Sequence, residues 1–363
     1  MKKLSFVVVC AVLLSTLSFD SYSQLNRKAI KRNNKRMASF RGKKRGFGRQ
    51  NVYSGVGISL NALNNFGDLA PLPRKFSTDI SFTSPSIGIS LYHRFGPRYT
   101  LQAQYMYGAI KGSDAESADR NDKENGQYRA LRNASFRNRM HELSVVAYFD
   151  LFENQSTYIS RVKWTPYVFA GGALFYHNPQ AQAPATDLQG NPLPQAGQWV
   201  DLQPLGTEGQ YSDLAPGDAN FGIKPYSLLQ FSIPFGIGAR FRINEVFDLW
   251  ADIGFRYTFT DYLDDVSANY TDIWKIKAKD PALTPLAQAM AYRTGEVVTD
   301  TSDPNLFTTY NAPDGKTYRL RNGYGTEYPT NNRGNRNNND IIMVTSVKLT
   351  YILGATFHKA KFR

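Results

Sequence analysis

The stretch LLQFSIPFGIGARFRI, residues 228–243, decides the fold because it alternates strictly over its whole length. Every second residue from Leu229 to Ile243 is apolar, whereas the positions between them include two arginines, Arg240 and Arg242. A period of two is typical of a β-strand with one apolar face. Strands in globular proteins commonly run about five or six residues, so this strand is unusually long.

A second strand, FDLWADIGFRYTFTDY, follows after the short link NEV (244–246). Such a link has the length of a β-hairpin loop. Apolar residues occupy the odd positions on both sides, so both apolar sets share one face of the sheet. This register places Arg242 opposite Asp248 and Arg240 opposite Trp250.

Six further segments alternate in the same way, and no long helical pattern interrupts them. These segments are 52–60, 87–92, 99–107, 142–151, 165–177 and 343–357. The segment 165–177 is apolar on both faces, so its register stays open. The long connections are 62–84, 111–135, 178–227 and 261–340, and the shorter ones are 95–97, 153–163 and 244–246.

This rhythm of short and long connections around an even number of strands is typical of outer-membrane barrels. We predict an all-β fold, an eight-stranded antiparallel transmembrane β-barrel with short periplasmic turns and long outer loops. Its apolar face meets outer-membrane lipid, and Arg240 and Arg242 point into the lumen. A closed barrel also leaves no unpaired backbone in lipid. The alternative is a secreted β-sandwich, which explains the alternation but not the loop rhythm.

The N-terminus predicts export. Residues 1–23 have a basic start, an apolar run and small residues near Ser23, as in a cleaved signal peptide. The alternative, a membrane anchor, needs a longer apolar run of about 20 residues. The sole cysteine, Cys10, lies in this segment, so the mature chain holds neither a disulfide nor a thiolate metal site. We expect three parts, the signal peptide, a basic periplasmic segment at 24–50 and the barrel at 51–363.

The basic segment carries most of the net charge of +13. It has no acidic residue between 25 and 50, and its basic residues include Arg27, Lys28, Lys31, Arg32, Lys35, Arg36, Arg41, Lys43, Lys44, Arg45 and Arg49. The first six recur every four residues, which would stack them on one helical face. The arm is either a hook for an acidic periplasmic partner or anionic lipid, or a solvated tail. Export excludes nucleic acid as a partner.

Charges of both signs alternate into the predicted lumen. We expect an ion-pair network of Glu142, Arg240, Arg242, Asp248, Asp252, Arg256 and Lys348. The interior of an eight-stranded barrel is only wide enough for side chains, and buried charges must be paired. The sequence therefore predicts a plug instead of an open channel.

Candidate catalytic chemistry is sparse. The four histidines, among them His177, have no metal-ligand spacing, and no G-x-S-x-G motif occurs. His177 and Asp261 lie on non-adjacent strands, which argues against a rim hydrolase. The acidic run DYLDDVS (261–267) lacks a calcium-loop pattern, so we interpret it as a turn or a loop-docking contact. We expect no enzyme, no catalytic residue, no cofactor and no metal.

Five stretches together carry a family resemblance. They are LRNASFRNRMHELSVVAYFDLF (131–152), TPYVFAGGALFYHNP (165–179), WVDLQPLGTEGQ (199–210), QFSIPFGIGARFRIN (230–244) and FRYTFTDYLDDVS (255–267). In these the chain resembles the PorG-like outer-membrane β-barrel family of Bacteroidetes, over most of residues 50–270 and again in the final strand. The basic arm and the asparagine-rich stretch PTNNRGNRNNND (329–340) are not part of that pattern.

The resemblance implies a role in type IX secretion, which exports proteins bearing a C-terminal signal and can support gliding. The implied partners are a periplasmic ring lipoprotein and its partner. The family assigns no catalytic residues. We expect loop contacts at the end of the barrel opposite the termini, from Leu205, Gly206, Glu208, Asp261, Tyr262, Asp264 and Asp265. The alternatives are a surface adhesion or ligand-binding barrel and a narrow passive pore.

Overall fold

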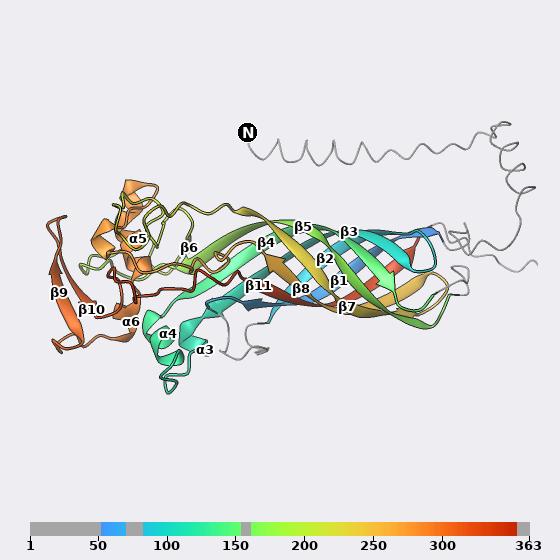
Figure 1. The fold of residues 1–363 in the computed structure, drawn as a ribbon, viewed down its shortest axis with the longest axis horizontal. Coiled ribbons are helices and arrows are strands. Elements are labelled where there is room, and N and C mark those ends of the chain that lie inside the picture. Colours follow the sequence, from blue (N-terminus) through green and yellow to red (C-terminus); the bar gives the residue numbers. More distant parts are fainter. Residues whose placement is uncertain (1–51, 70–82, 154–160, 354–363) are drawn as a thin grey trace, which may run out of the picture. The chain divides into compact units, whose positions relative to one another are not determined.

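The computed structural model describes residues 52–69, 83–153 and 161–353 (Figure 1). The predicted signal peptide, 1–23, and the basic segment, 24–50, therefore lie outside the described residues. The barrel is formed by β1 (Tyr53–Phe66), β2 (Ser84–Arg94), β3 (Tyr99–Ser113), β4 (Ser135–Asp150), β5 (Trp164–Gln182), β7 (Leu229–Arg242), β8 (Phe247–Thr258) and β11 (Ile341–Ile352). Each of the eight alternating segments of the sequence corresponds to one of these strands, although residues 354–357 of the last segment lie outside the described residues.

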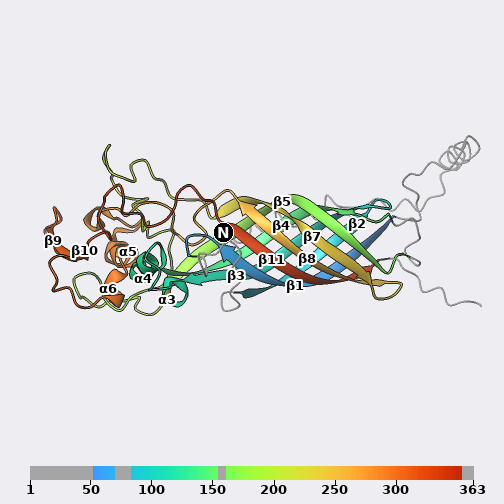
Figure 2. The same cartoon turned by 60° about the horizontal axis from the view of Figure 1, so that its bottom comes forward.

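The eight strands close into a ring. Each strand pairs antiparallel with its neighbour along the chain, except that β5 passes directly to β7, and β11 pairs with both β8 and β1. Closure removes both sheet edges, which a β-sandwich keeps. The predicted fold, an eight-stranded antiparallel barrel, is confirmed, and Figure 2 shows the strands tilted across one another.

The barrel is apolar outside and polar inside. On β7, Leu229, Phe231 and Ile237 are exposed on the outer face, with Ile237 exposed by 65 %, whereas Ser232 and Arg240 are buried on the inner face. The same alternation holds on β1, where Leu60 is exposed by 71 % and Asn61 is buried. An inward polar and outward apolar period of two is the inverse of a soluble barrel.

The structure settles the register of β5. Odd residues of this strand, including Tyr167, Phe169 and Phe175, are buried in the lumen, and Leu174 and Tyr176 face outward. The inward rings need space on the opposite strands. A Cβ atom at Gly236 would lie 2.7 Å from the Phe169 ring, so glycine at this position on β7 makes room for it.

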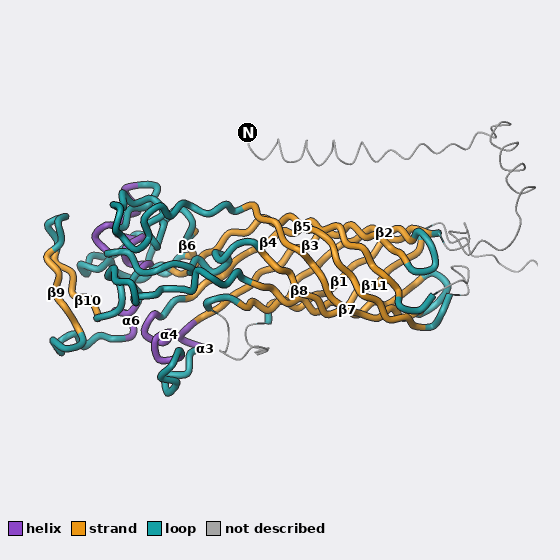
Figure 3. The backbone as a smooth tube through the Cα atoms, viewed as in Figure 1, coloured by secondary structure: helices purple, strands orange, loops and turns teal. Residues whose placement is uncertain are grey.

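The two ends of the barrel differ sharply (Figure 3). At one end β2 joins β3 and β7 joins β8 through tight turns, and the described chain begins and ends there, with the Leu353 amide donating to the Ser54 carbonyl. At the other end the loops form a folded cap. Its elements are α3 (Asp114–Ser117), α4 (Gly126–Arg132), β6 (Trp199–Asp201), η3 (Ile273–Lys275), η4 (Pro281–Leu283), α5 (Thr284–Ala291), α6 (Thr294–Val297), β9 (Phe307–Asn311) and β10 (Thr317–Arg321). The predicted alternation of short and long connections is confirmed.

The cap has a hydrophobic core of its own. Leu205 from the third long strand connection packs with Ile273, Leu286 on α5 and Tyr318 on β10. All four side chains are buried. A loop set with its own core is a folded body and not a collection of loose connections. None of the described helices combines the length and the apolar character needed to cross a membrane.

Candidate functional site

The lumen at the turn end is closed by ion pairs. Asp150 accepts a hydrogen bond from Arg94 Nη1 at 2.7 Å and from Arg240 Nη1 at 3.1 Å. Asp248 is held by Arg161, with Nη2 to Oδ1 at 2.6 Å. All five side chains are almost completely buried. Two carboxylates therefore share three guanidinium groups inside the barrel, which satisfies the requirement that buried charge be paired.

Of the residues predicted to form the lumen network, Glu142, Arg240, Asp248 and Arg256 form ion pairs. The register places Arg242 opposite Asp248, as expected, but Asp248 forms its ion pair with Arg161. Glu142 pairs with Arg256 at 3.4 Å, and Asp252 accepts a hydrogen bond from the Tyr167 hydroxyl at 3.0 Å. Arg242 Nη1 donates to the Arg161 carbonyl at 2.9 Å. Lys348 Nζ donates to Gln102 Oε1 at 3.1 Å.

Three members of the network were missed. Asp150 and Arg94 lie on inward positions of β4 and β2, so the period of two could have found them. Arg161 lies in the connection before β5, where no period applies. Its guanidinium reaches the carbonyls of Asn244 and Glu245 as well as Asp248, so it ties two turns together at this end.

The middle of the lumen is filled by aromatic rings around Trp250. This indole is completely buried. Its ring centroid lies 5.4 Å from that of Tyr92, 5.2 Å from Tyr148 and 5.7 Å from Tyr167. The Arg240 guanidinium lies 3.9 Å from the Trp250 ring centroid, which is a cation–π contact. The indole therefore packs directly against the ion pair of Arg240 with Asp150. Side chains fill the interior, as the predicted plug requires.

The loop that follows β8 closes the other end of the lumen. Leu263 and Val266 are inserted among buried side chains of the barrel mouth, including Met140 and Phe175. The Asn138 amide on β4 donates to the Leu263 carbonyl at 2.8 Å, and the Leu263 amide donates to Asp340 at 2.8 Å. The run DYLDDVS is therefore a loop-docking contact, one of the two interpretations that the sequence allowed.

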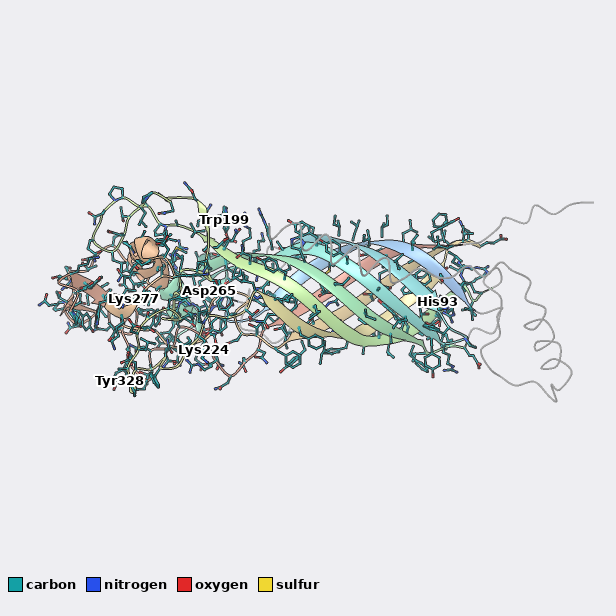
Figure 4. All side chains as sticks on the ribbon, turned by 90° about the horizontal axis from the view of Figure 1, so that it is seen from above. His93, Trp199, Lys224, Asp265, Lys277 and Tyr328 are labelled. Atoms are coloured by element: carbon teal, nitrogen blue, oxygen red, sulfur yellow. The ribbon has the colours of Figure 1, made fainter. Side chains whose placement is uncertain are left out.

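The stretch PLGTEGQ forms the other half of this docking. Glu208 is completely buried and accepts from the amides of Ser267 and Ala268 and from Arg333 Nη1, at 2.9, 3.1 and 2.9 Å. Figure 4 shows the neighbouring Asp265 between the barrel and the outer cap, with His93 at the opposite end of the barrel. This loop thereby fastens the cap to the barrel.

Two glycines allow this turn. Gly206 and Gly209 have φ angles of +61° and +92°, a region that side chains with a Cβ rarely adopt. The loop can therefore bend back so that Glu208 points inward. These turn residues also explain why the stretch is recognisable in the sequence.

The predicted loop contacts are at the expected end of the barrel but are not a free surface. Leu205, Gly206, Glu208, Asp261, Asp264 and Asp265 are buried, and Tyr262 is half-buried, stacked on the Tyr226 ring at 4.7 Å. Glu208, Asp264 and Asp265 contact other loops of the same chain, through Arg333, Leu69 and Thr207 respectively. The sequence could show where the loops lie but not that they fold together.

Burial changes the acidity of this cluster. Burial raises the pKa of Asp261 to about 8 and that of Asp265 to about 6, although Arg333 opposes the shift at Asp265. Burial and nearby carboxylates also raise the pKa values of Asp264 and Asp340. Desolvation disfavours the charged form of a carboxyl group. The cap is therefore held together by groups that keep protons at higher pH than exposed carboxyls do.

No metal geometry accompanies these carboxyls. Within residues 52–69, 83–153 and 161–353, no group of three or more His, Cys, Asp or Glu side chains is placed to hold a metal ion. His177 lies on β5 against Asn138, with Asn138 Nδ2 to His177 Nδ1 at 3.1 Å, and its ring stacks on Tyr226 at 6.2 Å. The structure thus uses His177 as packing at the barrel mouth.

The closed ring and filled lumen define the class, a small eight-stranded β-barrel with an enlarged loop cap. The family model of a domain of unknown function, DUF6089, matches residues 48–189. These residues include β1 to β5 and the beginning of the loop that follows β5. No curated protein is similar enough in sequence to count as a match.

Solved barrels resemble the chain in fold. Ail, the attachment invasion locus protein of Yersinia pestis, is 7 % identical, with 83 % of this chain and 98 % of that chain covered and a TM-score of 0.31. Neisserial surface protein A is 9 % identical, with 82 % and 96 % covered and a TM-score of 0.33. OprG of Pseudomonas aeruginosa is 6 % identical, with 83 % and 94 % covered and a TM-score of 0.32. At these identities the likeness concerns the fold alone.

Proposed function

We propose that the protein is a non-enzymatic barrel of the outer membrane that acts through its two ends and not through its lumen. The observation that carries the membrane placement is the outer face. Phe247 and Tyr257 mark the two ends of an apolar band on β8. Ten residue steps at about 3.3 Å, tilted by about 40°, give a height of about 25 Å. That height fits the hydrocarbon layer.

Exposed apolar side chains around the ring support the same placement. Between the aromatic positions, the outer face presents aliphatic residues such as Ile89, Leu143 and Val347, each exposed by half or more. A soluble protein rarely leaves a continuous apolar surface of this kind in water. Lipid is the partner that this chemistry fits.

The finer proposal is that the barrel anchors or scaffolds a type IX secretion assembly, with gliding as a further role. Its support is the resemblance of five sequence stretches to the PorG-like family. A filled lumen also suits an anchor better than a conduit. The proposed periplasmic partners are the ring lipoprotein and its partner, and the basic arm from Arg27 to Arg45 is the proposed contact.

A second candidate function is a surface-binding barrel. The cap favours it, because the chain between β8 and β11 folds around a hydrophobic core and extends beyond the barrel (Figure 1). A scaffold that works only on the periplasmic side does not need such a body. A narrow pore is a third candidate, which single-channel recording tests directly. A stable open current would contradict the filled lumen. It would also contradict the scaffold and the surface-binding barrel as proposed, because both act through the ends of the barrel and not through the lumen.

The deciding experiment is a cross-linked affinity purification of the tagged protein from gently solubilised outer membranes. A matched variant replaces the basic residues between 25 and 50 by glutamine and keeps the length of the arm. We expect periplasmic ring lipoproteins to co-purify with the natural protein and to be depleted with the variant. Recovery of the barrel alone from both would contradict the scaffold and leave the surface-binding barrel.

A further inference from the structure

A polar cleft of about 880 Å³ opens in the cap, and one of its walls shares Arg333 with the docking contact of Glu208. It lies between the end of β1, helix α4 and two segments of the last long loop, 322–324 and 330–338. Ligand sites of small molecules commonly measure about 300–1,000 Å³. The asparagine-rich stretch 329–340, which lies outside the family resemblance, supplies much of the lining.

The charged groups in the walls of the cleft are already engaged. Arg132 donates to Asp114 Oδ2 at 2.7 Å, to the Arg333 carbonyl at 2.7 Å and to the Asp68 carbonyl at 2.9 Å. Arg333 donates to Glu208 Oε1 at 2.9 Å. Both guanidiniums are buried. They hold the walls in place and have few donors left for an anionic ligand.

The polar groups of the cleft walls that remain free to bind a ligand are side-chain amides. In the described part of the chain, the side-chain amides of Asn125, Asn332 and Asn338 have no hydrogen-bond partner, and all three residues are exposed. Each amide offers both a donor and an acceptor. Hydroxyl groups also donate and accept, so amides match them without requiring a charge on the ligand.

An aromatic ring stands beside these amides. Tyr128 on α4 lines the cleft and is exposed by 60 %. Its backbone is fixed, because the Tyr324 hydroxyl donates to the Tyr128 carbonyl at 3.2 Å. An exposed aromatic ring offers an apolar face to the C–H groups of a ligand, with a polar tip at its edge.

We propose that this cleft binds a neutral carbohydrate. A sugar ring combines the two features that the cleft is built to meet, a set of hydroxyl groups for Asn125, Asn332 and Asn338 and an apolar face for Tyr128. The engaged guanidiniums of Arg132 and Arg333 argue against an anionic ligand. This binding site is independent of the proposed role in secretion and of the lumen.

The test compares two double variants of the full-length protein in detergent micelles. The cleft variant is Tyr128→Ala with Asn332→Ala. The matched control is Tyr328→Ala with Asn337→Ala, which removes the same side-chain types from exposed positions outside the cleft. Labelled protein is applied to a printed array of neutral, sialylated and sulfated glycans. The affinity for the strongest neutral oligosaccharide is then measured by titration calorimetry.

We expect signals on neutral glycans, and a loss of affinity of about tenfold or more in the cleft variant, because a stacking contact and a hydrogen bond are lost together. The control variant is expected to keep the natural affinity. The proposal is overturned if no neutral glycan gives a signal, if sulfated or sialylated glycans give the strongest signals, or if the two double variants bind alike.

Discussion

The lumen and the cap both bury charged side chains, but they position them by different means. In the lumen, Glu142 and Arg256 project from strands whose spacing is set by the hydrogen-bond ladder. In the cap, Glu208 and Arg333 come from loops 125 residues apart in the chain, and no ladder holds them. The comparison shows that lumen charges occupy places the barrel already provides, whereas cap charges are what hold the loops together.

Removal of Glu208 should break the cap and leave the barrel intact, which is the largest effect we expect. Glu208→Ala leaves Arg333 buried without its carboxylate and leaves the amides of Ser267 and Ala268 unpaired. Breaking a buried pair in this way costs about 3–5 kcal/mol. Hydrogen exchange at residues 261–268 should rise strongly, while heat-modifiable migration of the barrel stays normal. If Glu208→Ala also abolished the heat-modifiable migration of the barrel, the cap and the barrel would not be separable.

Removal of Trp250 should do the reverse. Trp250→Ala leaves a cavity in the aromatic centre of the lumen and should cost about 3–5 kcal/mol of barrel stability, as measured by urea unfolding in micelles. Exchange in the cap should change little. Trp199→Ala is the matched control, since Trp199 is exposed outside the lumen and contributes mainly a contact with Arg137. Equal losses in the two variants would contradict the packed lumen.

The cap should weaken as the pH rises from about 4 to about 8. Asp261 has a pKa of about 8 in the folded cap, whereas an unfolded aspartate loses its proton near pH 4. Between these values the folded state binds more protons than the unfolded state, so the free energy of unfolding falls with rising pH. Hydrogen exchange at 259–268, corrected for the intrinsic rate, measures this.

Asp261→Asn should reduce that pH dependence, and the remaining slope should come from Asp264, Asp265 and Asp340. Asp213→Asn is the control, because Asp213 is exposed and pairs with Lys277 on the surface, and the slope should persist in that variant. An unchanged slope after Asp261→Asn would assign the effect to other carboxyls of the cluster, Asp264 and Asp340 first.

The smallest effect is expected at the surface of the cap. Glu296 accepts from Arg293 at 2.8 Å, and its side chain is 34 % exposed. An exposed ion pair contributes less than about 1 kcal/mol, so Glu296→Ala should leave exchange at 261–268 close to that of the natural protein. A loss as large as that of Glu208→Ala would remove the distinction between buried and exposed pairs in the cap.

Much of the barrel could be predicted from the sequence. The strand count and the position of Arg242 opposite Asp248 follow from a period of two, which fixes the face of each residue in an alternating strand. The rhythm of loop lengths follows from the spacing between these strands. The inward position of Glu142, Asp252 and Lys348 follows in the same way. The register of β5 did not, because that strand is apolar on both faces.

Which buried charges pair with one another was decided by the tertiary structure alone. Arg161 forms an ion pair with Asp248 because the irregular connection before β5 places it there. Glu208 pairs with Arg333 because two loops that are distant in the chain fold over the barrel mouth. The cap core, the cleft beside Tyr128 and the raised pKa of Asp261 depend on the same fold. The sequence by itself determined which way the residues of seven barrel strands face, since that is set by neighbouring residues, and left β5 open. It did not determine which loops meet, since that depends on packing between segments far apart in the chain.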